Sequence, residues 1–379
     1  MTACPVLVLN AGSSSLKYQV VEVPGGARLL GGHVEEIGDT GFGPALDQVV
    51  RDVAEAGIDI EAVGHRVVHG GARHTRPELV DDALVASIDE LARLAPLHNP
   101  PAAEGIRRAR EAFPDLPQVA VFDTAFFASL PEVATTYAIE ASVASAEEIR
   151  RYGMHGTSHE YVAGVAADLL GWTIDDLDLI TLHLGNGASV AAISRGRPID
   201  TSMGLTPLEG LMMGTRAGDL DPGVLLHLMR HADMGLDELD DLLHHRSGLR
   251  GLTGYSDIRE VHKAVAAGDA GAQLALDVYC YRIRKYVGAY LAALGGADAI
   301  VFTAGVGEND ALVRNLSLQG LEPLGIELDP ELNESDDRGA RVVSSDGSEI
   351  DVVVVPTNEE LAIARQALEV VCPRSRQSD

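Results

Sequence analysis

The chain has few cysteines, no long apolar run and little positive charge. Its three cysteines, Cys4, Cys280 and Cys372, lie far apart, which argues against a disulfide framework and a cysteine-based zinc site. No apolar run reaches the roughly 18 residues of a membrane-spanning helix, and the first residues lack the pattern of a signal peptide. The net charge of −28 argues against nucleic acids and anionic membranes as partners. We therefore predict a globular, cytoplasmic protein with an acidic, solvated surface.

Two common nucleotide-binding motifs are also missing. The sequence contains neither the G-x-x-x-x-G-K-[ST] motif nor a G-x-G-x-x-G motif after a strand. If the protein binds a nucleotide, another arrangement must hold it.

Apolar runs alternate with amphipathic runs along the 379 residues. This alternation predicts an α/β fold with mixed sheets flanked by helices, and the length suits two domains. Strands are expected at residues 6–10, 17–23, 28–34, 62–68, 118–122, 179–184, 189–193, 299–303 and 352–356. Helices are expected at residues 44–56, 82–92, 102–112, 158–170, 222–229, 269–294 and 358–371.

Two segments share one plan. Residues 6–20, VLVLNAGSSSLKYQV, and residues 179–193, LITLHLGNGASVAAI, each read as a buried strand, a small polar turn and a returning strand. The repetition predicts a duplicated domain with a cleft between the halves, although two β-hairpins can also resemble each other by chance. The first turn could cradle a phosphate through backbone N–H groups and hydroxyls, or it could be an ordinary hairpin turn.

Glycine turns and arginines are the next candidates for anion binding. The turns at residues 185–187 and 305–309 each follow an apolar strand, so they could let a phosphate approach the backbone or could simply be tight connections. Arg66 and Arg216 lie in glycine-containing segments. A guanidinium binds carboxylate or phosphate through a bidentate fork, although a surface salt bridge is the common alternative.

Three further side chains could serve a metal ion or an anion. Asp123 ends an apolar strand, where it could hold a water of Mg²⁺, orient a nucleophile or cap the following turn. His155 precedes a helix start and could donate to an anion; its spacing to His159 does not suit zinc, because the two should not share a helix face. A capping box of Thr357 and Glu360 would leave Glu359 available for a metal.

These segments together resemble the acetate kinase family. The matching segments run in order through nearly the whole chain: NAGSSSLKY, GHRVVHGG, PLHNP, VFDTAF, YGMHGTSH, HLGNGAS, DTSMGLTPLEGLMMGTRAGDLDP, TAGVGEN and PTNEELAIAR. The resemblance implies two duplicated RNase H-like domains, of the actin-like ATPase type, with a nucleotide cleft between them. It implies an N-terminal domain of residues 1–145 and 360–379, a C-terminal domain of residues 146–359, and a homodimer.

The resemblance also implies roles for individual residues. Asn10 and Glu359 are the Mg²⁺-associated positions, with Mn²⁺ as an alternative ion. Arg66 and Arg216 grip acetate and the transferring phosphoryl group, Asp123 is the essential aspartate, and His155 is the transition-state histidine. Ser13, Ser15 and Lys17 face phosphate, and the acetate methyl pocket is Val68, Leu97 and Pro207. The nucleotide segments are His183, Leu184, Gly185, Asn186, Gly187, Asp257, Ile258, Arg259, Gly305, Val306, Gly307, Glu308 and Asn309.

The implied reaction is the reversible, Mg²⁺-dependent transfer of the γ-phosphoryl group of ATP to acetate, giving ADP and acetyl phosphate. Met154 stands where the family usually has Phe, beside the acetate pocket, so propionate or another short carboxylate is an alternative acceptor. A nucleotide-gated binding module of the Hsp70 type is a third hypothesis, and a metal-dependent hydrolase lacks a convincing set of ligands.

Overall fold

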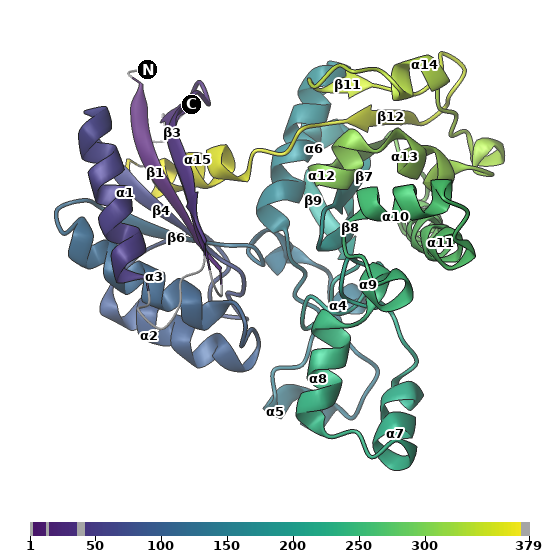
Figure 1. The fold of residues 1–379 in the computed structure, drawn as a ribbon. Coiled ribbons are helices and arrows are strands. Elements are labelled where there is room, and N and C mark those ends of the chain that lie inside the picture. Colours follow the sequence, from purple (N-terminus) through teal and green to yellow (C-terminus); the bar gives the residue numbers. More distant parts are fainter. Residues whose placement is uncertain (1–2, 13–14, 36–41, 373–379) are drawn as a thin grey trace. The chain divides into compact units, whose positions relative to one another are not determined.

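The computed structural model describes residues 3–12, 15–35 and 42–372, which form two compact units (Figure 1). Unit 1 comprises Met1–Ala128, Met154–Ser158 and Asn358–Asp379, and unit 2 comprises Ser129–Gly153 and His159–Thr357. The domain limits expected from the sequence, 1–145 with 360–379 for one domain and 146–359 for the other, refer to the duplicated domains and not to these compact units. They stay a prediction.

Unit 1 contains a mixed sheet with the strand order β3-β2-β1-β4-β6-β5. Its strands are β1 (Cys4–Ala11), β2 (Leu16–Val23), β3 (Arg28–Val34), β4 (Ala62–Val67), β5 (Glu78–Leu79) and β6 (Gln118–Phe122). The first three strands form an antiparallel meander, β4 and β6 continue the sheet in parallel with β1, and β5 closes the edge in the antiparallel direction. The central strands are buried on both faces, as their uninterrupted apolar runs predict.

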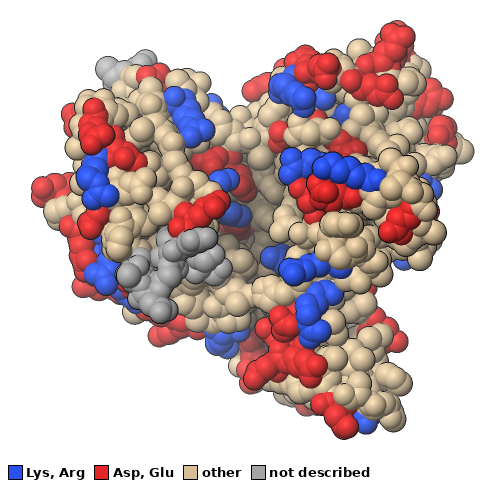
Figure 2. Space-filling model, in the orientation of Figure 1, with Lys and Arg blue, Asp and Glu red and all other residues tan. Residues whose placement is uncertain are grey.

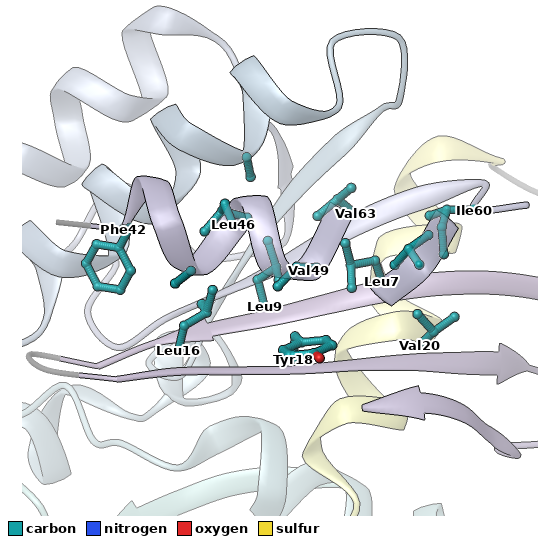
Figure 3. Packing of buried hydrophobic residues seen from close by; sticks show 13 residues of the cluster. Leu7, Leu9, Leu16, Tyr18, Val20, Phe42, Leu46, Val49, Ile60 and Val63 are labelled. Atoms are coloured by element: carbon teal, nitrogen blue, oxygen red, sulfur yellow. The ribbon is translucent and has the colours of Figure 1, made fainter. Parts of the chain in front are cut away.

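Helices cover both faces of this sheet. They are α1 (Gly43–Ala56), α2 (Asp82–Glu90), α3 (Asn99–Ala112) and α15 (Glu359–Val371), with 3₁₀ turns at Leu91–Arg93 and Phe126–Ser129. The apolar side of α1 packs on β1 and β2, where Leu46 and Val49 meet Leu9 and Tyr18 (Figure 3). Val63 of β4 belongs to the same core.

The C-terminal helix α15 packs on the opposite face of the unit 1 sheet. Gly64 follows Val63, and successive residues of a strand point to opposite faces. A Cβ atom at Gly64 would come within 2.8 Å of the Ile363 Cγ2 atom of α15. The missing side chain therefore lets the last helix of the chain approach the backbone of β4.

Unit 2 repeats this sheet with the order β11-β12-β10-β7-β8-β9. Its strands are β7 (Asp178–Leu184), β8 (Ala188–Ser194), β9 (Arg197–Thr201), β10 (Ala299–Thr303), β11 (Arg341–Val342) and β12 (Asp351–Val354). Strand directions match those of unit 1 one by one, and both meanders shift register between their second and third strands. The predicted fold class, duplicated mixed sheets flanked by helices, is confirmed; the cleft predicted between the domains stays a prediction.

The helices of unit 2 are more numerous. They are α4 (Glu132–Thr135), α5 (Ala141–Ala146), α6 (Gly156–Leu170), α7 (Pro222–His231), α8 (Leu236–His245), α9 (Gly248–Thr253), α10 (Ile258–Ala266), α11 (Ala270–Leu294), α12 (Ala304–Asn309), α13 (Ala311–Leu318) and α14 (Pro330–Asn333), with 3₁₀ turns at Ile174–Asp176 and Glu322–Leu324. The first residues of α6 belong to unit 1. Figure 1 shows α6 on one side of the β7–β9 meander and α10 and α11 on the other. In the described part of the chain no helix is both long and apolar enough to cross a membrane.

The local predictions succeed for the long elements and fail at some helix starts. All the expected strands and helices are present, but most of the shorter helices of unit 2 were not expected: α4, α5, α8, α9, α10, α12, α13 and α14. The predicted capping box is wrong: Asn358, not Thr357, caps α15, because its side chain accepts a hydrogen bond from Leu361 N at 3.0 Å. The glycine run at residues 305–309 forms α12 itself rather than a loop before a helix.

Candidate functional site

Arg66 and Asp123 meet at the carboxyl ends of two neighbouring parallel strands. Arg66 lies on β4 beside Val121 of β6, and Asp123 follows β6 directly. The Asp123 N–H continues the ladder by donating to the Val67 carbonyl oxygen at 2.9 Å. Parallel pairing thus brings together two side chains that are 57 residues apart, at the sheet edge where α/β proteins bind ligands.

The two side chains form a bidentate ion pair. Arg66 Nε lies 3.1 Å from both carboxylate oxygens of Asp123, and Nη2 donates to Oδ2 at 2.7 Å. The Glu359 Oε1 atom lies 3.9 Å from the same Nη2, so a second carboxylate shares the guanidinium. The Asp123 side chain is 1% exposed, against 18% for Arg66 and 20% for Glu359. Such charge-assisted pairs are strong and fix the plane of the guanidinium.

Burial and charge act in opposite directions on this pair. Burial raises the pKa of the Asp123 carboxyl above its ordinary value, and Arg66 opposes that rise. Burial alone would lower the pKa of Arg66, but Asp123 and Glu359 outweigh it and raise the pKa. Arg66 therefore stays charged at any relevant pH.

The segment Met154–Ser158 packs against Asp123. The Gly156 N–H donates to the Asp123 carbonyl oxygen at 2.9 Å, and Thr157 hydrogen-bonds the carboxylate. A Cβ atom at Gly156 would lie only 2.3 Å from that carbonyl oxygen, so only glycine fits there. His155, just before α6, has a left-handed backbone with a φ of 61°. His155 directly precedes Gly156, whose N–H donates to the Asp123 carbonyl oxygen.

The first polar turn lies on the same sheet. Leu9 pairs with His65, so Asn10 and Arg66 come next on the parallel strands β1 and β4. Lys17 pairs with Asn10 across the hairpin and is exposed. The Gly12 N–H donates to the Ser15 carbonyl oxygen at 2.8 Å, while Ser13 lies outside the described residues.

The residues predicted for the methyl pocket divide between the units. Val68 and Leu97 are half-buried in unit 1, and Pro207 is buried in unit 2. Met154 of unit 1 is buried.

Unit 2 contains a cavity of about 570 Å³, within the usual size range for small-molecule sites. Glycine turns and apolar side chains form most of its wall. The lining residues are Gly185, Asn186, Gly214, Leu249, Ser256, Asp257, Ile258, Arg259, Tyr279, Gly305, Val306, Asn309 and Asp310. At Gly214 a Cβ atom would lie 1.9 Å from the Asn186 Oδ1 atom, so the two turns meet only because this residue has no side chain.

Most residues predicted for the nucleotide line this cavity, but some do not. His183 is buried beside His159, Gly307 packs on Phe302, and Glu308 accepts a hydrogen bond from Thr357 N. Leu184 is buried, and Gly187 closes the turn through its carbonyl oxygen. Prediction from the sequence missed Gly214, Leu249, Ser256, Tyr279 and Asp310 as lining residues. Gly214 lies in one of the matched motifs, whereas Tyr279 carries no such signal.

Arg216 lies in a loop of unit 2 that is hydrogen-bonded to its neighbours. The Met213 N–H donates to the Arg216 carbonyl oxygen at 3.0 Å, and Gly214 N donates to Asn186 O. The Arg216 guanidinium has neutral acceptors: its Nη1 atom lies 3.3 Å from Pro207 O and 3.8 Å from Met213 Sδ. Within the described residues no carboxylate pairs with it, and burial lowers its pKa. Arg216 thus carries a positive charge that an anionic ligand could match.

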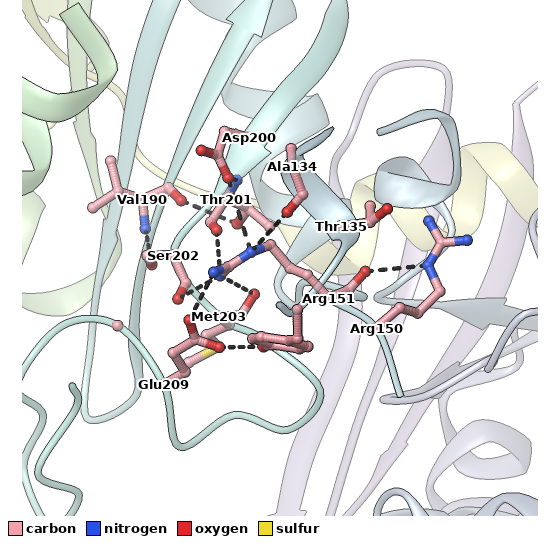
Figure 4. Close-up of polar contacts among 12 residues, drawn as sticks. Ala134, Thr135, Arg150, Arg151, Val190, Asp200, Thr201, Ser202, Met203 and Glu209 are labelled. Atoms are coloured by element: carbon pink, nitrogen blue, oxygen red, sulfur yellow. Dashed lines mark hydrogen bonds and ion pairs between the residues drawn. The ribbon is translucent and has the colours of Figure 1, made fainter. Parts of the chain in front are cut away.

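Arg151 anchors the segment that leads to this loop (Figure 4). Its Nη1 donates to three successive carbonyl oxygens, of Thr201, Ser202 and Met203, at 2.8, 3.1 and 3.2 Å. Its Nη2 donates to Glu209 Oε1 at 2.7 Å, and Tyr137 donates to the other oxygen of Glu209. One buried guanidinium therefore fixes both sides of the Pro207 turn.

The oxygen donors of unit 1 suit a hard cation. Glu359 supplies a carboxylate near Arg66, and Asn10 has an amide oxygen on the adjacent strand, while the nearby Asp123 carboxylate is bound to Arg66. Mg²⁺ prefers oxygen ligands and keeps several waters. In residues 3–12, 15–35 and 42–372, no three His, Cys, Asp or Glu side chains form a cluster that could hold a metal. The donor set therefore fits an ion that takes its remaining ligands from water and phosphate.

Acidic side chains are scattered over the visible face of both units, between larger areas of other residues (Figure 2). This distribution agrees with the solvated acidic surface predicted from the net charge of −28.

Comparison with known proteins gives concordant matches. The model of the acetokinase family matches residues 39–365. An acetate kinase of Leifsonia xyli subsp. xyli is 53% identical over 391 aligned positions, which cover 97% of this chain and 98% of the relative.

Two solved structures are also similar over nearly the full length. The acetate kinase of Porphyromonas gingivalis has a TM-score of 0.92 with 40% identity, covering 97% of this chain and 100% of its own. A propionate kinase of Francisella tularensis has a TM-score of 0.92 with 37% identity, at the same coverage.

Proposed function

The chain belongs to the acetokinase family, and we propose that it transfers the γ-phosphoryl group of ATP reversibly to acetate, giving ADP and acetyl phosphate. The observation that carries the proposal is the contrast between its two half-buried arginines, Arg66 and Arg216. Arg66 is held by carboxylates in unit 1, and Arg216 has only neutral acceptors in unit 2. A reaction that joins two anions needs both an oriented cation and an unmatched one.

The nucleophile needs no general base. A short carboxylic acid titrates near the value for Glu, about 4.3, so acetate is ionised at pH 7. The barrier arises from bringing an anion to a polyanion and holding the two in line. Asp123 therefore has no proton to accept from the substrate. Because both of its oxygens already bind Arg66, its role is to orient that guanidinium.

Arg66 binds the carboxylate of acetate, and Arg216 stabilises charge on the transferring phosphoryl group. Arg66 is 18% exposed, so a face of its fork stays accessible to a ligand. Arg216 is held in place by the 213–216 turn and the Arg151 anchor. His155, which directly precedes Gly156, adds a donor to the same charge.

The unit 2 cavity holds the nucleotide, and Lys17 and Ser15 face its phosphates. Asn10 and Glu359, with Asp123 nearby, would hold Mg²⁺, which when bound neutralises charge on the phosphates. Glu359→Gln should raise the Mg²⁺ concentration for half-maximal activity about tenfold, as loss of such a group commonly does.

Propionate is the second candidate acceptor. Met154 is buried next to His155, and its flexible thioether adapts to different neighbours. The ratio of kcat/KM for acetate to that for propionate decides between the two substrates.

We further propose a homodimer and a cytoplasmic location. The dimer is supported by α7, which buries none of its residues against the rest of the chain. Its apolar side chains Val224, Leu226 and Met229, and Leu220 just before it, are each between 42% and 49% exposed. Such a surface suits an interface between copies of the chain.

The test of the reaction is a hydroxylamine trap for acyl phosphate, with ATP, Mg²⁺ and a short carboxylate. We expect acetohydroxamate, in an amount equal to the ADP formed. If neither acetate, propionate nor butyrate yields a hydroxamate, the proposed function is wrong.

A further inference from the structure

Tyr279 of α11 has a buried hydroxyl without a partner. The side chain lines the unit 2 cavity and the residue is only 2% exposed. In the described part of the chain its Oη atom has no hydrogen-bond partner. Buried polar groups are nearly always hydrogen-bonded, so an unmatched one at a cavity wall indicates a partner that the chain does not supply.

Other tyrosines of the protein do find acceptors. Tyr286 of the same helix donates to Asp219 Oδ2 at 2.8 Å, and Tyr152 donates to Glu148 O at 2.9 Å. Tyr18 and Tyr137 donate to carboxylates. Unlike these four tyrosines, Tyr279 finds no acceptor among the described residues, and its side chain lines the cavity.

The surroundings of Tyr279 suit the uncharged part of a nucleotide. Asp310 also lines the cavity, and its charge contributes, after burial, to raising the pKa of the Tyr279 hydroxyl. Asp310 Oδ2 is paired with His262 Nε2 at 2.6 Å. A carboxylate near Tyr279 repels phosphate, whereas Leu249, Ile258 and the tyrosine ring offer apolar contact to a base.

We propose that the Tyr279 hydroxyl hydrogen-bonds the nucleoside part of the bound nucleotide. The inference rests on the proposed function, because it assigns a contact within the same nucleotide cavity. The phosphates would then lie toward the glycine turns, away from the two lining carboxylates Asp257 and Asp310.

The variant Tyr279→Phe removes only the hydroxyl and keeps the ring. We expect it to raise the Kd for ADP and for ATP by the same factor, about 3- to 10-fold, as for one neutral hydrogen bond. The KM for ATP should rise in parallel, while the KM for acetate stays unchanged. Without nucleotide, the Tm should not fall, because the hydroxyl bonds no described group.

Tyr281→Phe is the matched control. It is the same change on the same helix, at a residue that is 59% exposed and outside the cavity. Its Kd for ADP and its Tm should equal those of the wild type, measured by titration calorimetry and thermal unfolding.

Three results would overturn the inference: an unchanged Kd for ADP in Tyr279→Phe, a loss confined to ATP, or a lower Tm without nucleotide. These differ from a failure of the proposed function, in which the wild type itself would bind no ADP; that result overturns both.

Discussion

Arg66 and Arg216 share a charge and serve the same proposed reaction but differ in their surroundings. Arg66 is held by a bidentate carboxylate and lies 3.9 Å from a second one, whereas Arg216 contacts a carbonyl oxygen and a thioether sulfur. The first guanidinium has its charge balanced and its orientation fixed. The second has an orientation fixed by backbone and a charge that nothing in the described chain balances.

The two sheets place this difference in context. Strand order, strand directions and even the register shift after the second strand are the same in both units. The scaffold is therefore duplicated while the chemistry is not: unit 1 gathers charge at the ends of β4 and β6, and unit 2 opens a cavity between glycine turns and α11. Loops can diverge in this way because the core strands alone determine the sheet.

The largest effect should come from removing the unbalanced charge. We expect Arg216→Ala to lower kcat by about 10²- to 10³-fold, the scale of losing one key donor in the transition state. Folding should be little affected, because the side chain has no ion pair to lose. Arg246→Ala, an exposed arginine of the same unit paired with Asp241, is the control and should keep full activity. A raised KM for acetate with an intact kcat would contradict the role given to Arg216.

Removing the carboxylate partner of Arg66 should lower the stability of the protein as well as its activity. Asp123→Ala leaves Arg66 buried with only Glu359 at 3.9 Å. Breaking a buried pair by removing one partner should cost about 3 kcal/mol in the free energy of unfolding. Urea unfolding measures this loss of unfolding free energy. Hydrogen exchange should show faster exchange of the backbone amides in β4 and β6. If amide exchange in the unit 2 strands increased equally, the destabilisation would not be local to the Arg66–Asp123 pair.

Acid should weaken unit 1 through His65, the neighbour of Arg66. Burial lowers the pKa of His65 from 6.5 to about 4, and its Nε2 lies 2.8 Å from Gln118 Oε1. The unfolded chain binds a proton near pH 6.5 and the folded chain only near pH 4. As the pH falls between these values, the unfolding free energy should drop by about 3 kcal/mol.

The variant His65→Asn checks this prediction because it cannot titrate. Between pH 6.5 and pH 4, the unfolding free energy of the variant should decrease by about 3 kcal/mol less than that of the wild type. Parallel pH curves for the two proteins would rule out His65 as the source.

The smallest effect concerns the helix cap next to the charged cluster. Asn358→Ala should cost about 1 kcal/mol, because the Leu361 N–H loses its acceptor. Asp269 caps α11 of unit 2 by accepting hydrogen bonds from Gly271 N and Ala272 N. The substitution Asp269→Ala should therefore lower the unfolding free energy by about 1 kcal/mol as well. Activity should fall only for Asn358→Ala, since Asn358 directly precedes Glu359. Loss of activity in both variants would weaken the division between the units.

Local patterns were enough to predict the sheet strands and the long helices, but not most of the short helices of unit 2. Apolar runs such as residues 6–9 and 299–303 have no other stable place than a buried strand. Helix starts were less certain, because Thr357 and Asn358 are adjacent and both are good caps; only the backbone geometry selects Asn358. The short helix α10 was missed, although Asp257 caps it by accepting from Arg259 N at 2.9 Å.

Sequence motifs were enough to name candidate residues of the site, but not to predict which of their side chains contact each other. The motifs identified Arg66, Asp123 and Arg216 as candidates, yet the Arg66–Asp123 ion pair depends on β4 lying beside β6, a long-range register that no local pattern encodes. Tyr279 was missed because a tyrosine among apolar residues of a long helix looks like any core residue. Only the cavity and the unmatched hydroxyl distinguish it.

The central claim is that unit 2 binds the nucleotide while the Arg66–Asp123 pair of unit 1 serves the carboxylate. The most direct measurement is the Kd for ADP of wild type and of Asp123→Ala in the absence of Mg²⁺, compared with their acyl hydroxamate formation in its presence. We predict ADP affinities equal within about twofold, as for independent sites, together with a large loss of hydroxamate in the variant. A parallel loss of ADP affinity and hydroxamate formation would contradict the claim.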